Sequence, residues 1–139
     1  MCYNNNQVSF VITGRVICKN VAGFISVLQS VFASIPHTLF LTPEAYYHSL
    51  VYLLLKLLGF AIHAEPLTNL GRIDAVLDLP EAIYIIEFKM STAQIALDQI
   101  RAKQYDLPYR NAGKPILLLG IAFDPTNRNI ADWQMEQTG

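Results

Sequence analysis

The chain has 139 residues, of which 53% are hydrophobic and only 15% charged, and its formal net charge is −1. This length predicts one small domain with a true hydrophobic core, and the apolar fraction is above that of an average soluble domain. The charge balance excludes a broad positive surface of the kind that attracts nucleic acid. Any affinity for nucleic acid must therefore come from a local patch or from a bound cation.

Residues 1–20 give no clear pattern. They form either a hairpin around Thr13-Gly14 or the end of an upstream domain, and we favour the second interpretation, so that the folded domain spans residues 21–139. Cys2 and Cys18 lack metal-ligand spacing and are predicted to be free thiols in a reducing compartment, which favours a cytoplasmic protein. The apolar run of residues 50–60 is too short to span a bilayer.

Two helices are predicted first. Residues 21–34 carry apolar side chains at helical spacing, namely Phe24, Val27, Leu28 and Val31, and we expect them to contact a partner chain or a neighbouring domain. Thr42 then caps a helix that runs to Leu58. Glu44 falls on the line of this helix that faces the sheet. The alternative is a glutamate placed in the first turn by the helix dipole.

A hairpin follows a short strand over residues 60–66, and it spans Gly71 to Met90. A tight turn centred between Pro80 and Glu81 pairs residues that are equally distant from it. Asp74 is therefore predicted to lie opposite Glu87, with the two side chains roughly 5 Å apart on one face. Lys89 lies two residues further on and shares that face.

Two carboxylates placed opposite each other destabilise a sheet. A divalent cation would neutralise them, and hard carboxylate oxygens suit Mg²⁺ or Mn²⁺. The alternative is a surface salt-bridge cluster, which we disfavour because this hairpin is the most apolar in the chain and such clusters contribute little stability.

The remaining elements are a helix over residues 92–105, a continuous apolar strand over residues 115–123 and a short edge strand over residues 128–134. The helix must cross over to deliver the apolar strand parallel to a neighbour. The order predicts an α/β sandwich around a mixed sheet.

Asp74, Glu87, Phe88 and Lys89 form the pattern D-x12-E-F-K, which resembles the motif of the PD-(D/E)XK nuclease superfamily. The stretches GRID, EFK, ALDQI, GIAF and NIADW look like one branch of it, and the resemblance covers residues 24–133. Ile73 stands where proline is usual. The resemblance implies a restriction-endonuclease-like α-β-β-β-α-β core, a mixed sheet flanked by helices, with an extra N-terminal helix. It also implies an upstream AAA-type ATPase-like domain in a longer protein.

The resemblance implies a metal-dependent nuclease that acts on DNA. Asp74, Glu87 and the carbonyl of Phe88 would be metal ligands. Glu44, on the preceding helix, would bind a second ion or hold a water. Lys89 would activate the attacking water or neutralise the developing charge, and Gln99 would orient Lys89 or contact a phosphate.

Two basic residues are candidates for substrate binding. Arg72 is predicted to pair with Lys89 and is either a phosphate clamp or a solvated strand-end residue. Lys103, four residues after Gln99, is a further candidate for substrate binding. Relatives carry Q-x-x-x-Y on this helix, whereas Tyr105 here lies about 240° around from Gln99 and does not share its face.

Two other functions compete with the nuclease. The first is a catalytically inactive domain of nuclease fold that binds a partner, which the low charge and apolar composition favour; a homodimer is one way to cover such a surface. The second is a small-molecule hydrolase, for which the chain offers no Ser-His or Cys-His arrangement. We expect no membrane contact.

Overall fold

The computed structural model describes residues 21–39, 44–57, 62–64 and 67–138. The expected N-terminal hairpin or upstream remnant, Cys2 and Cys18 lie outside the described residues. In chain order the elements are α1 (Val21–Ser34), η1 (His37–Leu39), α2 (Glu44–Leu57), β1 (Ile62–Ala64), β2 (Leu67–Thr68), β3 (Gly71–Arg72), β4 (Ala75–Asp78), β5 (Ile83–Lys89), α3 (Ala93–Ala102), η2 (Leu107–Tyr109), β6 (Ile116–Asp124) and β7 (Asn129–Thr138).

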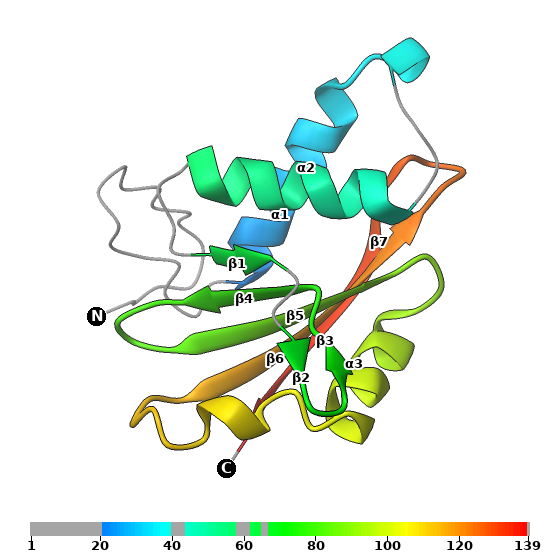
Figure 1. Cartoon of the computed structure of the whole chain (residues 1–139). Coiled ribbons are helices and arrows are strands. Elements are labelled where there is room, and N and C mark those ends of the chain that lie inside the picture. The colour runs from blue at the N-terminus through cyan, green and yellow to red at the C-terminus, as the bar shows by residue number, and fades with distance from the viewer. Residues whose placement is uncertain (1–20, 40–43, 58–61, 65–66, 139) are drawn as a thin grey trace.

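The main sheet has the strand order β1-β4-β5-β6-β7. Every neighbouring pair is antiparallel except β5 and β6, which are parallel because α3 crosses over between them. Helices α1 and α2 lie on one face of this sheet and α3 lies on the other (Figure 1). The predicted α/β fold with a mixed sheet flanked by helices and an N-terminal helix is confirmed.

The hairpin of β4 and β5 has the predicted register. The amide of Leu79 donates to the carbonyl of Ala82 at 2.9 Å and closes the turn, and Ala75 lies opposite Ile86. The turn fixes this register. A shift of one residue would move every side chain of the strand to the opposite face of the sheet.

The prediction that Arg72 pairs with Lys89 is wrong. Arg72 belongs to a separate two-stranded sheet in which it lies opposite Leu67. A local turn competes for this segment, because the Thr68 hydroxyl donates to the Gly71 carbonyl and accepts from the Leu70 amide. The ladder with β5 therefore begins only at Ala75.

The last strand is longer than predicted. It runs from Asn129 to Thr138 along the edge of the sheet, with an irregularity in the pairing opposite Ala122 and Phe123. Its outward face carries polar residues, so the sequence lacks the apolar run that would predict a strand of this length.

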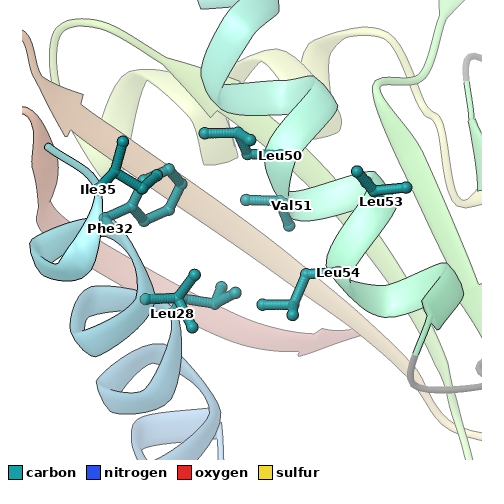
Figure 2. Close-up of a pocket in the computed structure, with 8 residues that line it drawn as sticks. Leu28, Phe32, Ile35, Leu50, Val51, Leu53 and Leu54 are labelled. Carbon is teal, nitrogen blue, oxygen red and sulfur yellow. The ribbon is translucent and has the colours of Figure 1, made fainter. Parts of the chain in front are cut away.

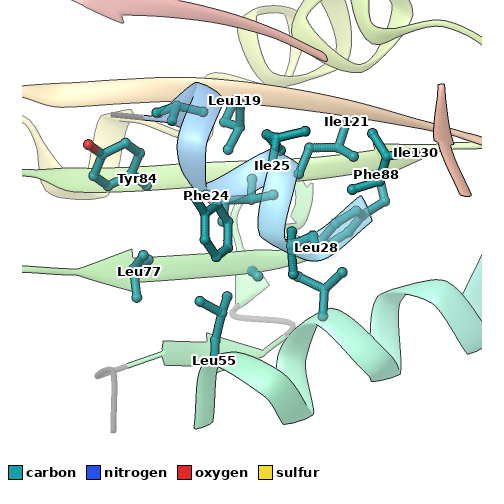
Figure 3. Close-up of a cluster of buried hydrophobic side chains, with 14 of the residues drawn as sticks. Phe24, Ile25, Leu28, Leu55, Leu77, Tyr84, Phe88, Leu119, Ile121 and Ile130 are labelled. Atoms are coloured by element: carbon teal, nitrogen blue, oxygen red, sulfur yellow. The ribbon is translucent and has the colours of Figure 1, made fainter. Parts of the chain in front are cut away.

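The hydrophobic core has two parts. The larger one joins α1 and α2 to the sheet, as Figure 3 shows for residues from both helices and four strands. Phe88, Phe123 and Tyr47 form its centre, with ring centroids 5.5 Å apart for Phe88 and Phe123 and 4.5 Å apart for Phe123 and Tyr47. The smaller part lies between α3 and the other face of the sheet.

Helix α1 is not the free apolar face that its stripe predicted. Phe24 and Leu28 are buried in the chain's own core, and only Val31 of the four named residues is exposed, at 38%. Within the described residues, no helix is both long enough and apolar enough to cross a membrane.

Candidate active site

Glu87 is a buried carboxylate near the end of β5. It is 2% exposed, and its Oε1 accepts a hydrogen bond from the Gln99 side-chain amide at 2.5 Å. Lys89 Nζ lies 3.8 Å from the same oxygen. A charge removed from water must be compensated by partners of this kind, so Glu87, Lys89 and Gln99 form one polar group on the face of the sheet that α3 covers.

Asp74 lies just before β4 and contacts β5 through its carboxylate. Its Oδ2 accepts a hydrogen bond of 2.8 Å from the backbone amide of Phe88. If the antiparallel ladder continued, this amide would donate to a backbone carbonyl of the neighbouring strand. The Asp74 carboxylate takes the place of that carbonyl. The Asp74 carboxylate therefore lies beside the peptide units that join Glu87, Phe88 and Lys89.

The backbone of Phe88 is directed toward the same place. The amide of Ile83 donates to the carbonyl of Pro115, the residue just before β6. Odd-numbered residues of β5 therefore direct their backbone groups toward β6. Phe88 directs its groups toward β4, as its bond to Asp74 shows. Its carbonyl thus lies on the edge that Asp74 occupies, as a metal-ligand role requires.

Helix α2 begins at the same end of the sheet. The Tyr47 ring stacks on Phe123, near the end of β6, and the His48 ring lies 4.9 Å from that of Phe88. Burial raises the pKa of the Tyr47 phenol, and the neighbouring charge of Arg128 opposes this shift. Glu44 is the first residue of α2, one turn before these contacts; its side chain lies outside the part that the structure describes.

The other predicted residues lie further from Glu87 or have other roles. Lys103 is the exposed C-terminal cap of α3, and its amide donates to the Gln99 carbonyl. Arg72 is exposed on β3. Tyr105 is buried in the α3 core, and a Cβ added to Gly71 would lie 2.8 Å from its hydroxyl. Tyr105 thus packs against the segment that leads to Asp74 and does not share a face with Gln99.

The sequence reasoning missed Gly120, which lies beside Glu87 in the register of β5 and β6. A glycine inside a buried strand signals a close approach of another backbone. That signal was present in the apolar run of residues 115–123, and at Gly120 the backbone of α3 lies against the strand.

The donors at this site fit a hard divalent cation. Two carboxylates and a backbone carbonyl are oxygen ligands of the kind that Mg²⁺ and Mn²⁺ prefer. Among the described residues no group of three or more His, Cys, Asp and Glu side chains gathers, so the carbonyl of Phe88 and the side chain of Glu44 would have to complete the set.

A second feature, a groove between α1 and α2, has a different character. It encloses about 150 Å³ and is lined only by apolar side chains from the two helices (Figure 2). Leu53, at its edge, is 53% exposed. The groove offers no group for acid, base or metal chemistry, so it is not the active site.

Comparison with known proteins identifies a family for this chain. A model of the PD-(D/E)XK nuclease superfamily matches residues 42–133, which include Glu44, Asp74, Glu87, Lys89 and Gln99. The chain is also 32% identical over 131 residues to the "Uncharacterized protein in vnfD 5'region" of Azotobacter chroococcum mcd 1, in an alignment that covers 88% of the chain and 25% of the relative. The chain therefore spans about a quarter of that relative's length. The family model covers well over half of this chain and includes the residues gathered at the open end of the β4–β5 hairpin, and the chain belongs to the PD-(D/E)XK nuclease superfamily.

Proposed function

We propose that this domain is a metal-dependent nuclease that hydrolyses phosphodiester bonds in DNA. The observation that carries the proposal is the position of Asp74. Its carboxylate bonds to the Phe88 amide and so lies beside the buried Glu87 and its neighbour Lys89. Stability alone does not require this arrangement, because a backbone carbonyl would satisfy the amide equally well without adding a negative charge near Glu87.

Asp74, Glu87 and the carbonyl of Phe88 would hold Mg²⁺ or Mn²⁺, and Glu44 would bind a second ion or an ordered water. When bound, such an ion lowers the pKa of a coordinated water and neutralises charge on the phosphate. The protein's own part is to fix the Glu87 carboxylate in place. Gln99 does so by donating to Oε1 at 2.5 Å, which defines the orientation of the carboxylate.

Lys89 would act on the reacting phosphate. It is 25% exposed and lies 3.8 Å from the nearest oxygen of Glu87, which is longer than a direct hydrogen bond. Its ammonium group therefore keeps donors for a phosphate oxygen or for the attacking water. This is the position from which a cation stabilises the charge that develops in the transition state.

The substrate and the parent protein are further parts of the proposal. With eleven acidic and ten basic residues, the chain has no excess of positive charge, so binding to DNA would depend on the metal and on local cations such as Arg72 and Lys103. The relative from Azotobacter is about four times as long as the aligned segment, which supports a nuclease domain within a longer protein. The ATPase-like domain upstream rests on the resemblance of the motifs alone.

The direct test is cleavage of plasmid and oligonucleotide DNA with Mn²⁺, Mg²⁺ or a chelator. Wild-type protein should cleave only with the metal, and Asp74→Ala and Glu87→Ala should lose both metal binding and cleavage. Lys89→Ala should keep the metal, because lysine is not a ligand, and lose cleavage. Cleavage by Asp74→Ala at the wild-type rate would contradict the proposal.

A second candidate function is a nuclease fold that no longer cleaves and instead binds a partner protein or a second copy of this chain. The apolar groove between α1 and α2 and the net charge of −1 favour it. Titration with Mn²⁺ separates the two functions, because an inactive domain has no need to retain affinity for the ion.

A further inference from the structure

The backbone of helix α3 lies directly against Gly120 of β6. A Cβ added there would lie 2.5 Å from the Ala93 carbonyl oxygen and 3.1 Å from the Leu97 amide nitrogen. Both atoms belong to the helix backbone and cannot rotate away. The added atom would also lie 3.0 Å from the Ala96 Cβ. Any side chain at position 120 must therefore move α3 away from β6 as a body.

The same helix holds Glu87 in place. Gly120 lies beside Glu87 in the parallel pairing of β6 with β5, and Gln99 lies one turn after Ala96 on α3. The bond from Gln99 to Glu87 measures 2.5 Å and joins a helix side chain to a strand side chain. An added Cβ reaches an ordinary contact of 3.4 Å from the Ala93 oxygen only if the helix retreats by about 0.9 Å. The same retreat would lengthen the bond from Gln99 to Glu87 from 2.5 Å to about 3.4 Å, beyond the range of about 2.7–3.2 Å that N–H···O hydrogen bonds occupy.

We propose that Gly120 is a positioning residue for the active site. By admitting α3 to the surface of the sheet, it lets Gln99 reach Glu87 and hold the carboxylate in the orientation that a metal requires. The role in metal binding rests on the proposed function. The linkage itself, from Gly120 through α3 to the bond between Gln99 and Glu87, is a property of the folded protein without metal.

The first experiment measures Mn²⁺ affinity by titration calorimetry in Gly120→Ala, Gln99→Ala and the double variant. Groups that orient a metal ligand typically change affinity by about 10-fold to 100-fold. We expect each single variant to weaken binding in that range, and the double variant to be little weaker than either. Wild-type affinity in a folded Gly120→Ala protein would overturn the inference.

Gly113→Ala is the matched control. Gly113 has a φ of +74°, so alanine is strained there, yet a Cβ would meet nothing within 4 Å. This variant should lower stability and leave Mn²⁺ affinity within about twofold of the wild type. If Gly113→Ala lowers the affinity for Mn²⁺ as much as Gly120→Ala does, general destabilisation explains both losses, and the inference fails.

A second measurement does not depend on metal binding. Urea unfolding of the same four proteins forms a double-mutant cycle between positions 99 and 120. We expect the loss caused by Gln99→Ala to shrink to less than half in the Gly120→Ala background, because the bond is already broken. Additive losses would overturn the inference. If the cycle shows coupling while the wild type binds no Mn²⁺, the positioning stands and the proposed nuclease fails.

If Gly120→Ala does not fold, Ala96→Val replaces it. The extra methyl groups press on the sheet at the same place but belong to a side chain that can adjust. The expected results are the same coupling and the same loss of affinity, each smaller than for Gly120→Ala, and their absence would count against the inference.

Discussion

Each end of the β4–β5 hairpin carries a lysine beside an acid, and the two pairs differ in burial and in geometry. At the turn end, Lys114 lies 2.5 Å from Asp78 and also donates to the Leu79 carbonyl, while Asp78 is 45% exposed. At the open end, Lys89 stays 3.8 Å from Glu87, which is 2% exposed. The first pair is in direct contact and its acid faces water, whereas in the second pair the lysine stands further off and the acid is buried.

The difference shows which charges serve the fold. An exposed, directly bonded pair contributes little stability and needs no further ligand. A buried carboxylate whose cation stands off at 3.8 Å, with Asp74 bonded to the amide of the next residue, gains most from an additional cation. Substitutions at matched positions of the two ends can test this distinction.

The largest effect should be on catalysis. Lys89→Met should lower the turnover of DNA cleavage by about 100-fold or more, the scale for loss of one transition-state contact. Lys114→Met removes the same charge from the other end of the hairpin and should leave turnover unchanged. Turnover should be measured under saturating Mn²⁺ for both variants, and equal losses would erase the distinction between the two ends.

Metal binding should stabilise the protein through one end only. Free Mn²⁺ at about 100 times its Kd should raise the free energy of unfolding of the wild type by about 2.7 kcal/mol. Asp78→Asn should show the same gain, and Asp74→Asn should show none. Thermal melts with and without Mn²⁺ measure this, and a gain that survives in Asp74→Asn would place the ion elsewhere.

Gln99→Ala tests the cost of burying Glu87. The loss of the amide leaves a buried carboxylate without its main donor, so the free energy of unfolding should fall by about 1–3 kcal/mol. Gln94→Ala is the control, because Gln94 bonds to Asp98 on the exposed side of the same helix. Its effect in urea unfolding should stay within about 0.5 kcal/mol. Equal losses at the two positions would contradict the burial of Glu87.

The smallest expected effect on stability is that of the ion pair between Arg101 on α3 and Glu136 on β7. This pair is exposed, like the pair of Lys114 and Asp78 at the turn end of the hairpin. The hydrogen bond from Arg101 is the main cause that lowers the pKa of Glu136 below its ordinary 4.5. The stability it adds is therefore complete above pH 4.5 and disappears as the pH falls through the lowered value. Comparison of Glu136→Gln with the wild type across this range, at low and high salt, should show a small, screened difference. A difference that persists below that range would contradict this assignment.

Much of the fold was predictable because its signals are local. The turn at Pro80-Glu81 fixes the register of β4 and β5, which carries Asp74 to the Phe88 amide beside Glu87, and Thr92 caps α3 by accepting from the Ile95 amide. The resemblance to the nuclease motif added Gln99, which the structure places in contact with Glu87.

The features of the fold and the site that could not be predicted depend on contacts that sequence spacing does not encode. The turn at Thr68 withdraws Arg72 from the ladder. The bond from Asp74 to the Phe88 amide replaces a backbone partner at the very point where the ladder ends. The approach of α3 to Gly120 depends on the packing of a helix against a strand that follows it in the chain.

The most direct measurement is a crystal structure of the protein soaked in millimolar Mn²⁺, with data collected to locate the ion by its anomalous scattering. We predict a peak about 2.2 Å from carboxylate oxygens of both Asp74 and Glu87, with the Phe88 carbonyl as a further ligand, and no peak beside Asp78. Absence of the ion from the open end of the hairpin, in a crystal where Asp74 still contacts the Phe88 amide, would contradict a metal-dependent nuclease and favour the partner-binding domain.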